Sequence, residues 1–207
     1  ALVSDIGGTT TDVAVLRDGR PSIDPDGARV GPYRTMVEAV AMRTTGLGGD
    51  SEVHFVSEGL KGGVTLGPRR LLPIALIALD APKVVHASLD EQLRASAPGE
   101  YDGRFLRAVS GVPREGLEAR EETLLERIGD RVQPMTKVLR NRIELKALRR
   151  LVERGIVQIA GVTPSDASHV LGSLSSWERE AAEKAIILFG RRRNGSGNML
   201  APNPMDM

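Results

Sequence analysis

The sequence predicts a mixed α/β fold, and three observations lead to that prediction. Two apolar segments flank a turn rich in glycine and threonine near the N-terminus, as in a strand–turn–strand unit. Apolar side chains then recur at helical spacing over residues 118–152. Strand-like segments return between the helical ones, at 101–110 and 156–159. With 207 residues, one domain or one domain carrying an insertion is expected.

The composition excludes several classes of protein. The chain has 28 basic and 27 acidic residues, so no overall field attracts nucleic acid or a membrane. It has no cysteine, which excludes disulfides, thiol nucleophiles and cysteine-ligated zinc. The most apolar run, residues 71–79, is half the length needed to cross a bilayer, and no secretory signal opens the sequence. We therefore expect a cytoplasmic protein with no membrane contact.

The N-terminal stretch, residues 2–16, carries the clearest chemistry. Because Gly7 and Gly8 lack a Cβ, the backbone can approach a bulky anion, and successive amides can cradle phosphate oxygens. Residues 13–16 are an apolar run, which is typical of a strand buried on both faces. Three hydroxyls that can bond a phosphate or a metal-bound water follow the glycines, on Thr9, Thr10 and Thr11.

Two carboxylates bracket this turn, Asp5 before it and Asp12 after it. They would repel a bare phosphate, but they suit a site where Mg²⁺ lies between them and the phosphates. We therefore predict a hairpin for Mg–nucleotide phosphates, in which Asp5 and Asp12 hold the ion through water or orient the attacking group. An ordinary polar turn is the alternative interpretation.

The elements from 17 to 112 are predicted mainly from turns and periodicity. Residues 17–20 form a hairpin turn into a short strand at 21–23, and residues 30–42 form a further strand. A glycine-rich loop at 44–51 precedes paired strands at 52–56 and 63–66, where His54 points outward. A buried helix is expected at 71–79, an amphipathic helix or a strand–helix step at 83–97, and a strand at 101–110.

Residues 113–160 are predicted to form a helical insertion. Helices at 118–128, 134–140 and 143–152 and a strand at 156–159 resemble a winged-helix subdomain. Arg149 and Arg150 belong to a basic third helix, the element that would enter a DNA groove. Glu144 and Glu153 interrupt that basic face, so we expect no nucleic acid. The expected role is to pack on the main body or to contact a partner chain.

A well-marked helix follows at 163. Thr163 is its predicted N-cap, Pro164 suits its first turn, and Gly172 ends it. Asp166 or His169 could lie at a ligand cleft, but the preferred interpretation is that Asp166 stabilises the helix N-terminus. A second capping box at 175–178 is expected to begin a long core helix, with Trp177 as a packing residue.

Three stretches together resemble the hydantoinase/oxoprolinase family of the actin-like ATPase superfamily. Residues 5–12, Asp-Ile-Gly-Gly-Thr-Thr-Thr-Asp, resemble the second phosphate motif of that family. Residues 44–51, Thr-Thr-Gly-Leu-Gly-Gly-Asp-Ser, resemble its glycine-rich loop, which adds Gly48 and Gly49 to the nucleotide-binding candidates. Residues 163–172, beginning Thr-Pro-Ser-Asp-Ala, resemble a later family segment.

The resemblance implies a fold, cofactors and an activity. The fold would be an actin-like (ribonuclease H-like) lobe of mixed sheet and flanking helices, formed by 1–112 and 161–207 around the winged-helix-like insertion at 113–160. The cofactors would be ATP and Mg²⁺. The activity would be ATP-dependent opening of a small cyclic amide, such as a hydantoin or 5-oxoproline, by phosphoryl activation. Some members of the family carboxylate ketones instead.

The family pattern also implies partners. Only one of the two expected phosphate hairpins is present, so a first lobe is expected before Ala1 and an adenosine-binding segment after Met207. The missing lobe of the same chain, and a possible partner subunit, would complete the site, and the isolated fragment is expected to be inactive. Two alternatives stay open, a regulatory or interaction protein with a winged-helix-like module and a small-molecule kinase of the same superfamily.

Overall fold

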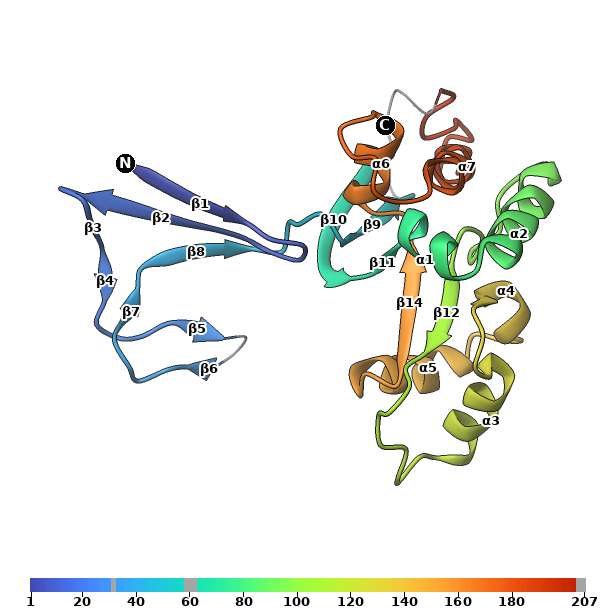
Figure 1. Ribbon diagram of the computed structural model, residues 1–207, viewed down its shortest axis with the longest axis horizontal. Helices are drawn as coiled ribbons and strands as arrows, with labels where there is room; N and C mark the ends of the chain where they lie inside the picture. Colours follow the sequence, from blue (N-terminus) through green and yellow to red (C-terminus); the bar gives the residue numbers. More distant parts are fainter. Residues whose placement is uncertain (31–32, 58–62, 204–207) are drawn as a thin grey trace.

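The computed structural model describes residues 1–30, 33–57 and 63–203. A long β-ribbon, residues 1–45, projects from a larger body that holds all the labelled helices (Figure 1). The tip of the first hairpin lies at the end of the ribbon nearest the body.

The inner part of the ribbon is a three-stranded antiparallel sheet. Strand β2 (Thr11–Arg17) lies between β1 (Leu2–Ile6) and β8 (Met42–Thr45). Strand β3 (Arg20–Pro21) pairs back on the end of β2, and Asp18 and Gly19 in the intervening turn have φ values of 52° and 77°. These left-handed conformations are those of a tight hairpin turn, so the predicted turn is confirmed.

The outer part of the ribbon is narrower. Strand β4 (Ile23–Asp24) pairs with β7 (Ala39–Val40), and β5 (Arg29–Val30) pairs with β6 (Tyr33–Arg34). The prediction of one strand over 30–42 is therefore wrong. Because β5 and β6 pair antiparallel, this segment belongs to two opposed strands of the ribbon and not to one. Residues 31 and 32 lie outside the described part.

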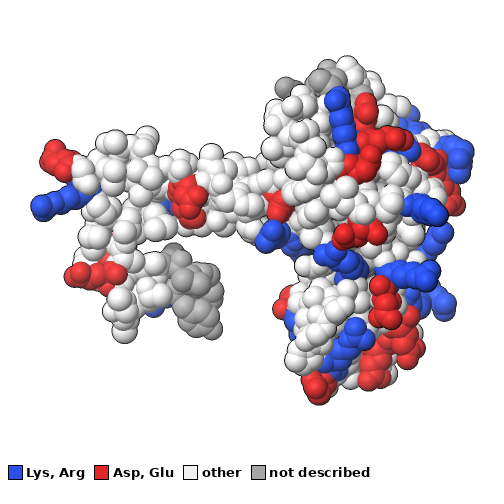
Figure 2. Space-filling view, in the orientation of Figure 1, with Lys and Arg blue, Asp and Glu red and all other residues white. Residues whose placement is uncertain are grey.

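The expected burial of residues 13–16 on both faces is also wrong, because none of the four is buried and Val15 is 44% exposed. Every residue of β1 is exposed, and Leu2 and Ile6 are each 73% exposed. The strands have the composition of a sheet interior, but no described helix or sheet covers the ribbon (Figure 1). Figure 2 shows that the visible face of the ribbon is largely uncharged, whereas the body carries both positive and negative side chains.

A second hairpin links the ribbon to the body. Strands β9 (Ser51–Val56) and β10 (Gly63–Arg70) pair antiparallel, with Val53 opposite Leu66 and Phe55 opposite Val64. The predicted strand pair is confirmed, and β10 runs four residues further than expected.

The body is built on a mixed four-stranded sheet in the order β11-β14-β12-β13. Strand β11 (Leu72–Pro73) is parallel to β14 (Val157–Gly161), which is antiparallel to β12 (Phe105–Ala108). Strand β13 (Gln133–Pro134) pairs antiparallel with the outer side of β12.

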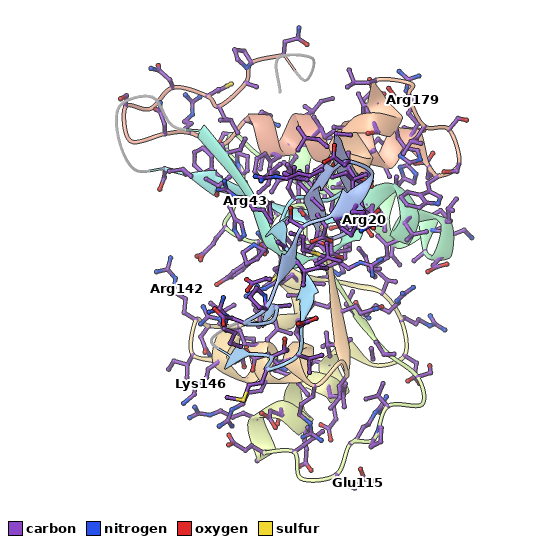
Figure 3. The ribbon with its side chains drawn as sticks, turned by 90° about the vertical axis from the view of Figure 1, so that its left-hand side faces the viewer. Arg20, Arg43, Glu115, Arg142, Lys146 and Arg179 are labelled. Atoms are coloured by element: carbon purple, nitrogen blue, oxygen red, sulfur yellow. The ribbon has the colours of Figure 1, made fainter. Side chains whose placement is uncertain are left out.

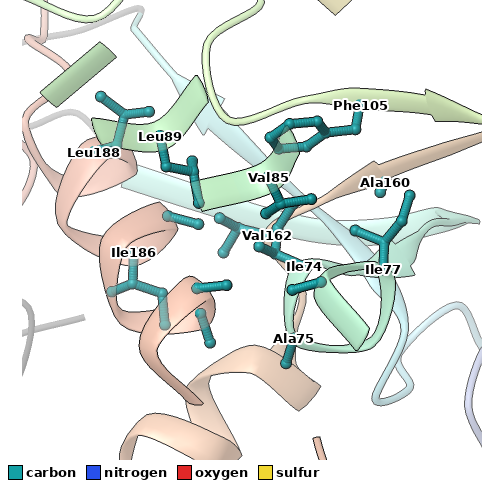
Figure 4. Packing of buried hydrophobic residues seen from close by; sticks show 14 of the residues in the cluster. Ile74, Ala75, Ile77, Val85, Leu89, Phe105, Ala160, Val162, Ile186 and Leu188 are labelled. Atoms are coloured by element: carbon teal, nitrogen blue, oxygen red, sulfur yellow. The ribbon is translucent and has the colours of Figure 1, made fainter. Parts of the chain in front are cut away.

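Successive residues of the central strands enter two separate cores. Phe105 and Ala160 pack with α1 (Ile74–Asp80), α2 (Pro82–Arg94) and α7 (Arg179–Gly190) (Figure 4). Their neighbours Leu106 and Ile159 pack with α3 (Ala119–Ile128), α4 (Met135–Val138) and α5 (Glu144–Glu153). The two-residue period of a strand thus places helices on both faces of the sheet. The body is a mixed α/β layered unit, while the actin-like and winged-helix comparisons and the boundaries at 113 and 160 stay predictions.

The ends of the later helices follow local signals. Helix α6 (Pro164–Val170) starts with a reciprocal capping box between Thr163 and Asp166, and Gly172 follows it with φ of 78°. The capping box expected at 175–178 is wrong. Glu178 is itself the N-cap of α7, and its side chain accepts from the Ala181 amide. Within the described residues, none of the helices combines the length and hydrophobicity that crossing a bilayer requires.

Candidate functional site

The two bracketing carboxylates lie opposite each other near the tip of the first hairpin. Asp5 and Asp12 are direct cross-strand partners, so their side chains leave the same face of the sheet. Thr44 is the partner of Asp12 on the other side and extends the row to three strands. Its hydroxyl donates to Asp12 Oδ1, and the Thr10 hydroxyl donates to Asp12 Oδ2 at 3.3 Å.

This placement creates an unbalanced local charge. Like charges in directly opposed sheet positions repel each other, and neither carboxylate forms an ion pair within the described chain. Asp12 receives hydrogen bonds from two hydroxyl groups, which stabilise its negative charge without neutralising it. The pair is therefore arranged as a cation ligand set would be, with oxygen donors on one face of a rigid sheet.

The turn itself offers backbone donors. The Gly7 amide donates to the Thr10 carbonyl at 2.9 Å and closes the turn. The amides of Gly8, Thr9 and Thr10 make no hydrogen bond to any described residue, and Gly7 and Gly8 are exposed. Consecutive free amides at an exposed turn form the kind of concavity that binds an anion.

The glycine-rich loop packs against this turn. The Asp50 amide donates to the Gly8 carbonyl at 2.6 Å, and a Cβ on Gly48 would lie 2.5 Å from the Gly8 carbonyl carbon and the Thr9 nitrogen. Thr11 donates its hydroxyl to the Leu47 carbonyl at 2.6 Å. Thr11 thus lies on the face opposite Asp12 and anchors the loop, whereas Thr10 lies on the carboxylate face.

The third motif meets the other two through Gly49. The Gly49 amide faces the Gly7 carbonyl at 3.4 Å, and its carbonyl accepts from the Ser165 amide at 2.8 Å. The Ser165 hydroxyl donates to Asp50 at 3.2 Å, at the start of α6. The three stretches singled out in the sequence therefore converge on one place, although Gly48 and Gly49 contact protein rather than open space.

Arg70 is a neighbour of the tip that sequence reasoning missed. Its guanidinium pairs with Asp50 at 2.9 Å, and its side chain is largely exposed. It also lies 3.9 Å from the position of a Cβ built on Gly8. Arg70 follows Arg69 in β10, and the alternation of a strand was the one signal that could have separated their roles.

Asp166 and His169 are structural. Asp166 is fully buried and accepts from the Ala75 amide at 2.7 Å and from the Thr163 amide and hydroxyl, each at 2.9 Å. Burial outweighs these hydrogen bonds and raises the pKa of Asp166 to about 6. His169 Nδ1 lies 2.7 Å from the Ser165 carbonyl, and its ring stacks on Trp177. Two predictions are confirmed, that Asp166 stabilises the N-terminus of α6 and that Trp177 is a packing residue.

The residues at the tip fit a Mg²⁺ ion only in a particular way. In the described ranges, no group of three or more histidine, aspartate or glutamate side chains is arranged so that it could hold a metal ion by itself. Two carboxylates with hydroxyl neighbours suit an ion that takes its remaining ligands from water and phosphate oxygens. Asp5 and Asp12 would hold such an ion.

Residues 1–71 match the family model described as Hydantoinase/oxoprolinase. No curated protein matches the chain. One solved structure, described as "Mechanism of ATP-Dependent Acetone Carboxylation, Acetone Carboxylase nucleotide-free structure", is 18% identical with a TM-score of 0.40. The alignment covers 90% of this chain and 16% of that one. The likeness to the hydantoinase/oxoprolinase family is thus confirmed over residues 1–71, the part that contains the hairpin and the loop packed on it.

Proposed function

We propose that this chain supplies a phosphate-binding hairpin to an ATP-dependent enzyme. The observation that carries the proposal is the opposed pair Asp5 and Asp12 beside a turn with three free amides. The amides of Gly8, Thr9 and Thr10 would hold phosphate oxygens, and Arg70 would add positive charge at the rim. The family match over residues 1–71 supports this assignment.

The chemistry proposed is phosphoryl activation. Bound Mg²⁺ would neutralise phosphate charge, the main electrostatic requirement of phosphoryl transfer. The γ-phosphoryl group passes to the oxygen of an amide, and ADP leaves. One water would then add to the amide carbon, and breaking of the carbon–nitrogen bond would release the amine and leave an acyl phosphate. A second water would hydrolyse the acyl phosphate to the carboxylate and free phosphate. The residues of this chain would position the phosphates and orient the attacking group rather than form covalent bonds.

A small cyclic amide, of the hydantoin or 5-oxoproline type, is the proposed substrate. This finer assignment rests on the family match. In the enzyme that carries this chain, ATP, Mg²⁺ and 5-oxoproline should yield ADP, phosphate and the ring-opened acid. A stable phosphorylated product would instead support a small-molecule kinase.

We also propose that another lobe or subunit covers the ribbon. The support is the apolar side chains exposed along it, among them Leu2, Ile6 and Met42. Such a lobe would face the phosphates from the opposite side and complete the site. The chain alone is then expected to bind phosphates without turning over ATP.

The test is binding of ATP to the chain by calorimetry, with and without Mg²⁺. ATP should bind more tightly with Mg²⁺, and Asp12→Asn should weaken that binding about tenfold, the worth of one charge-assisted contact. The matched control is Asp18→Asn, because Asp18 lies in the turn at the far end of β2 and asparagine tolerates its positive φ.

Two results would overturn the proposal. One is ATP affinity that does not depend on Mg²⁺. The other is an equal loss in Asp12→Asn and Asp18→Asn, which would indicate a diffuse charge effect.

The regulatory alternative gains little from the structure. Two basic side chains of the α5 region are paired with carboxylates, Arg142 with Glu100 at 2.9 Å and Arg150 with Glu118. Paired arginines are poor phosphate ligands for DNA, because an existing partner must first be displaced. Salt-sensitive duplex binding, lost in Arg149 and Arg150 variants, would still favour it.

A further inference from the structure

A cavity of about 580 Å³ lies in the body, away from the hairpin tip. Its walls come from β9, β10, α5, the end of α7 and the segment before β12. The volume is within the range of small-molecule sites. No residue of the first hairpin lines it, so its occupant is a separate question from the phosphate site.

The wall combines cations with an apolar lining. Four arginines and two glutamates line the cavity, together with His54 and Tyr101. The apolar lining includes Phe55, Leu148, Ile159 and Phe189. The arginines are Arg69, Arg104, Arg149 and Arg192.

Two of these arginines are already committed to a buried carboxylate. Glu52 is almost fully buried, and its Oε1 pairs with Arg104 at 2.7 Å. Its Oε2 lies 3.8 Å from Arg69 and 3.4 Å from His54, without a hydrogen bond to any described residue. The charges of Arg69 and Arg104 are thus largely balanced inside the wall.

The other two arginines have no carboxylate partner in the described chain. Arg149 is exposed on α5 at the rim and forms no ion pair there. Arg192 donates to the Glu100 and Asp102 carbonyls in two long contacts of 3.3 and 3.4 Å, and its guanidinium lies over the Phe189 ring, 5.3 Å from the centroid. Its Nε forms no hydrogen bond to a described residue. Burial, aided by repulsion from Arg104, lowers the pKa of Arg192, so a nearby anion would stabilise its charge.

A further unused polar group lies in the same wall. The Tyr101 hydroxyl is buried without a hydrogen bond of normal geometry to a described residue, and burial together with the nearby Glu100 carboxylate raises its pKa. A buried hydroxyl without a partner costs free energy, and a ligand oxygen would supply the missing bond. Two residues with unsatisfied buried atoms, Tyr101 and Arg192, therefore line the cavity, and Glu52 lies behind its wall in contact with Arg69, Arg104 and His54.

We propose that this cavity binds a small organic carboxylate with an apolar or aromatic body. The carboxylate would lie between Arg149 and Arg192 and accept from the Tyr101 hydroxyl, and the body would pack against Phe189 and Leu148. An apolar body fits the lining better than a bare inorganic anion, which would leave that surface uncovered. The assignment is independent of the phosphate hairpin.

The experiment is a ligand-observed NMR titration of the whole 207-residue chain with three probes. Benzoate has the proposed charge and shape, benzamide has the shape without the charge, and inorganic phosphate has the charge without the body. Benzoate should saturate one site, and benzamide should bind about tenfold more weakly, as expected for loss of a charge-assisted contact. Phosphate should not compete with benzoate.

Two variants and a matched control test the geometry. Arg149→Gln should weaken benzoate binding about tenfold. Tyr101→Phe should weaken it several-fold while leaving the thermal midpoint unchanged or higher, since it removes an unpaired buried hydroxyl. Lys146→Gln removes the same charge from α5 outside the cavity and should have no effect; Figure 3 shows Lys146 and Arg142 on the same side of the molecule.

Several outcomes would overturn the proposal. Equal binding of benzoate and benzamide would show that the carboxylate is not recognised. Equal losses in Lys146→Gln and Arg149→Gln would show non-specific charge attraction. Displacement of benzoate by phosphate would reassign the cavity to bare anions. Absence of saturable benzoate binding up to about 10 mM would also refute the assignment, because two charged contacts should give at least that affinity. Asp12→Asn should leave benzoate binding unchanged, which separates this result from the test of the hairpin.

Discussion

Gly48 is the point where the glycine-rich loop touches the first hairpin backbone to backbone. An added Cβ would lie 2.5 Å from two backbone atoms of Gly8 and Thr9, neither of which can rotate away. Gly48→Ala should therefore push the loop from the tip, at a cost of about 1–3 kcal/mol in unfolding free energy. Urea unfolding would measure this cost.

Gly63→Ala is the matched control for that substitution. Gly63 lies at the start of β10, and no described atom is within 4 Å of its added Cβ. Its unfolding free energy should change by less than about 0.5 kcal/mol. Equal effects in the two variants would show that the contact at Gly48 does not matter.

The buried Asp166 carboxylate predicts a pH dependence of stability. Its folded pKa of about 6 is above the ordinary 3.8, so the folded state holds the proton more tightly than the unfolded chain. Stability should fall as pH rises from about 4 to 6, by about 3 kcal/mol, and then level off.

Asp166→Asn isolates this contribution. Urea unfolding of both proteins at several pH values should show the fall between pH 4 and 6 in the wild type and not in the variant. The other carboxyl groups titrate in both proteins, so their contribution cancels in the difference. The amide also loses an acceptor facing Ala75 or Thr163, a constant penalty at all pH values. A pH-independent difference would contradict the assigned pKa.

At the scale of single residues, several positions of the candidate phosphate site could be predicted from the sequence. Asp5, Asp12 and the glycines were predictable because their spacing around a two-strand turn fixes their positions. Arg70 was not, because its contact with Asp50 depends on where β10 lies relative to the loop. The anchoring role of Thr11 was equally hidden, since it depends on the neighbouring loop carbonyl.

Among the elements, α5 is joined to α3 by a partly buried ion pair. Arg127 contacts Glu144 at 2.5 Å and also donates to the Val138 carbonyl. Hydrogen bonding from Arg127 is the main reason that the pKa of Glu144 lies below its ordinary value. A carboxyl group with a lowered pKa stabilises the folded state at pH values above its unfolded pKa of about 4.5. This stabilisation is lost as the pH falls through the pKa of the folded state.

Glu144→Gln should therefore destabilise the protein at pH 7 and much less at pH 3. The cost at neutral pH should be about 1–3 kcal/mol, since one charge-assisted contact is weakened and Arg127 is left partly buried. Glu126→Gln, an exposed position on α3, serves as the control and should change stability little at either pH. A loss that is the same at both pH values would exclude the ion pair as its cause.

The elements also show where sequence reasoning succeeds. Helices α3 and α5 were predicted closely because an amphipathic helix shows its buried face within a few turns of local sequence. Strands β11 and β13 have two residues each, too few for any period to be visible. The prediction of a single strand over 30–42 failed because the antiparallel pairing of β5 with β6 depends on contacts across the ribbon.

Across the whole molecule, stability is expected to be divided unequally. The body sheet is covered on both faces by helices, whereas the described chain leaves β1 exposed along its length. A strand-type composition indicates that a surface can be buried, but it does not say which chain buries it. The prediction that residues 13–16 are buried on both faces therefore failed, because their local sequence does not specify which chain covers them.

This division predicts two levels of amide protection. Ribbons without a packed face are marginally stable, and local opening there requires less free energy than opening of a core. Native-state hydrogen exchange should show amides of β1 and β2 opening at least about 2 kcal/mol more easily than those of β12 and β14. The hydrogen-bonded pairing of both sheets controls for secondary structure, so a difference must come from packing. If another lobe or subunit covers the ribbon in the working enzyme, adding it should raise protection in β1 and β2 while leaving β12 and β14 unchanged. Equal protection in the isolated chain would instead mean that the ribbon needs no covering partner.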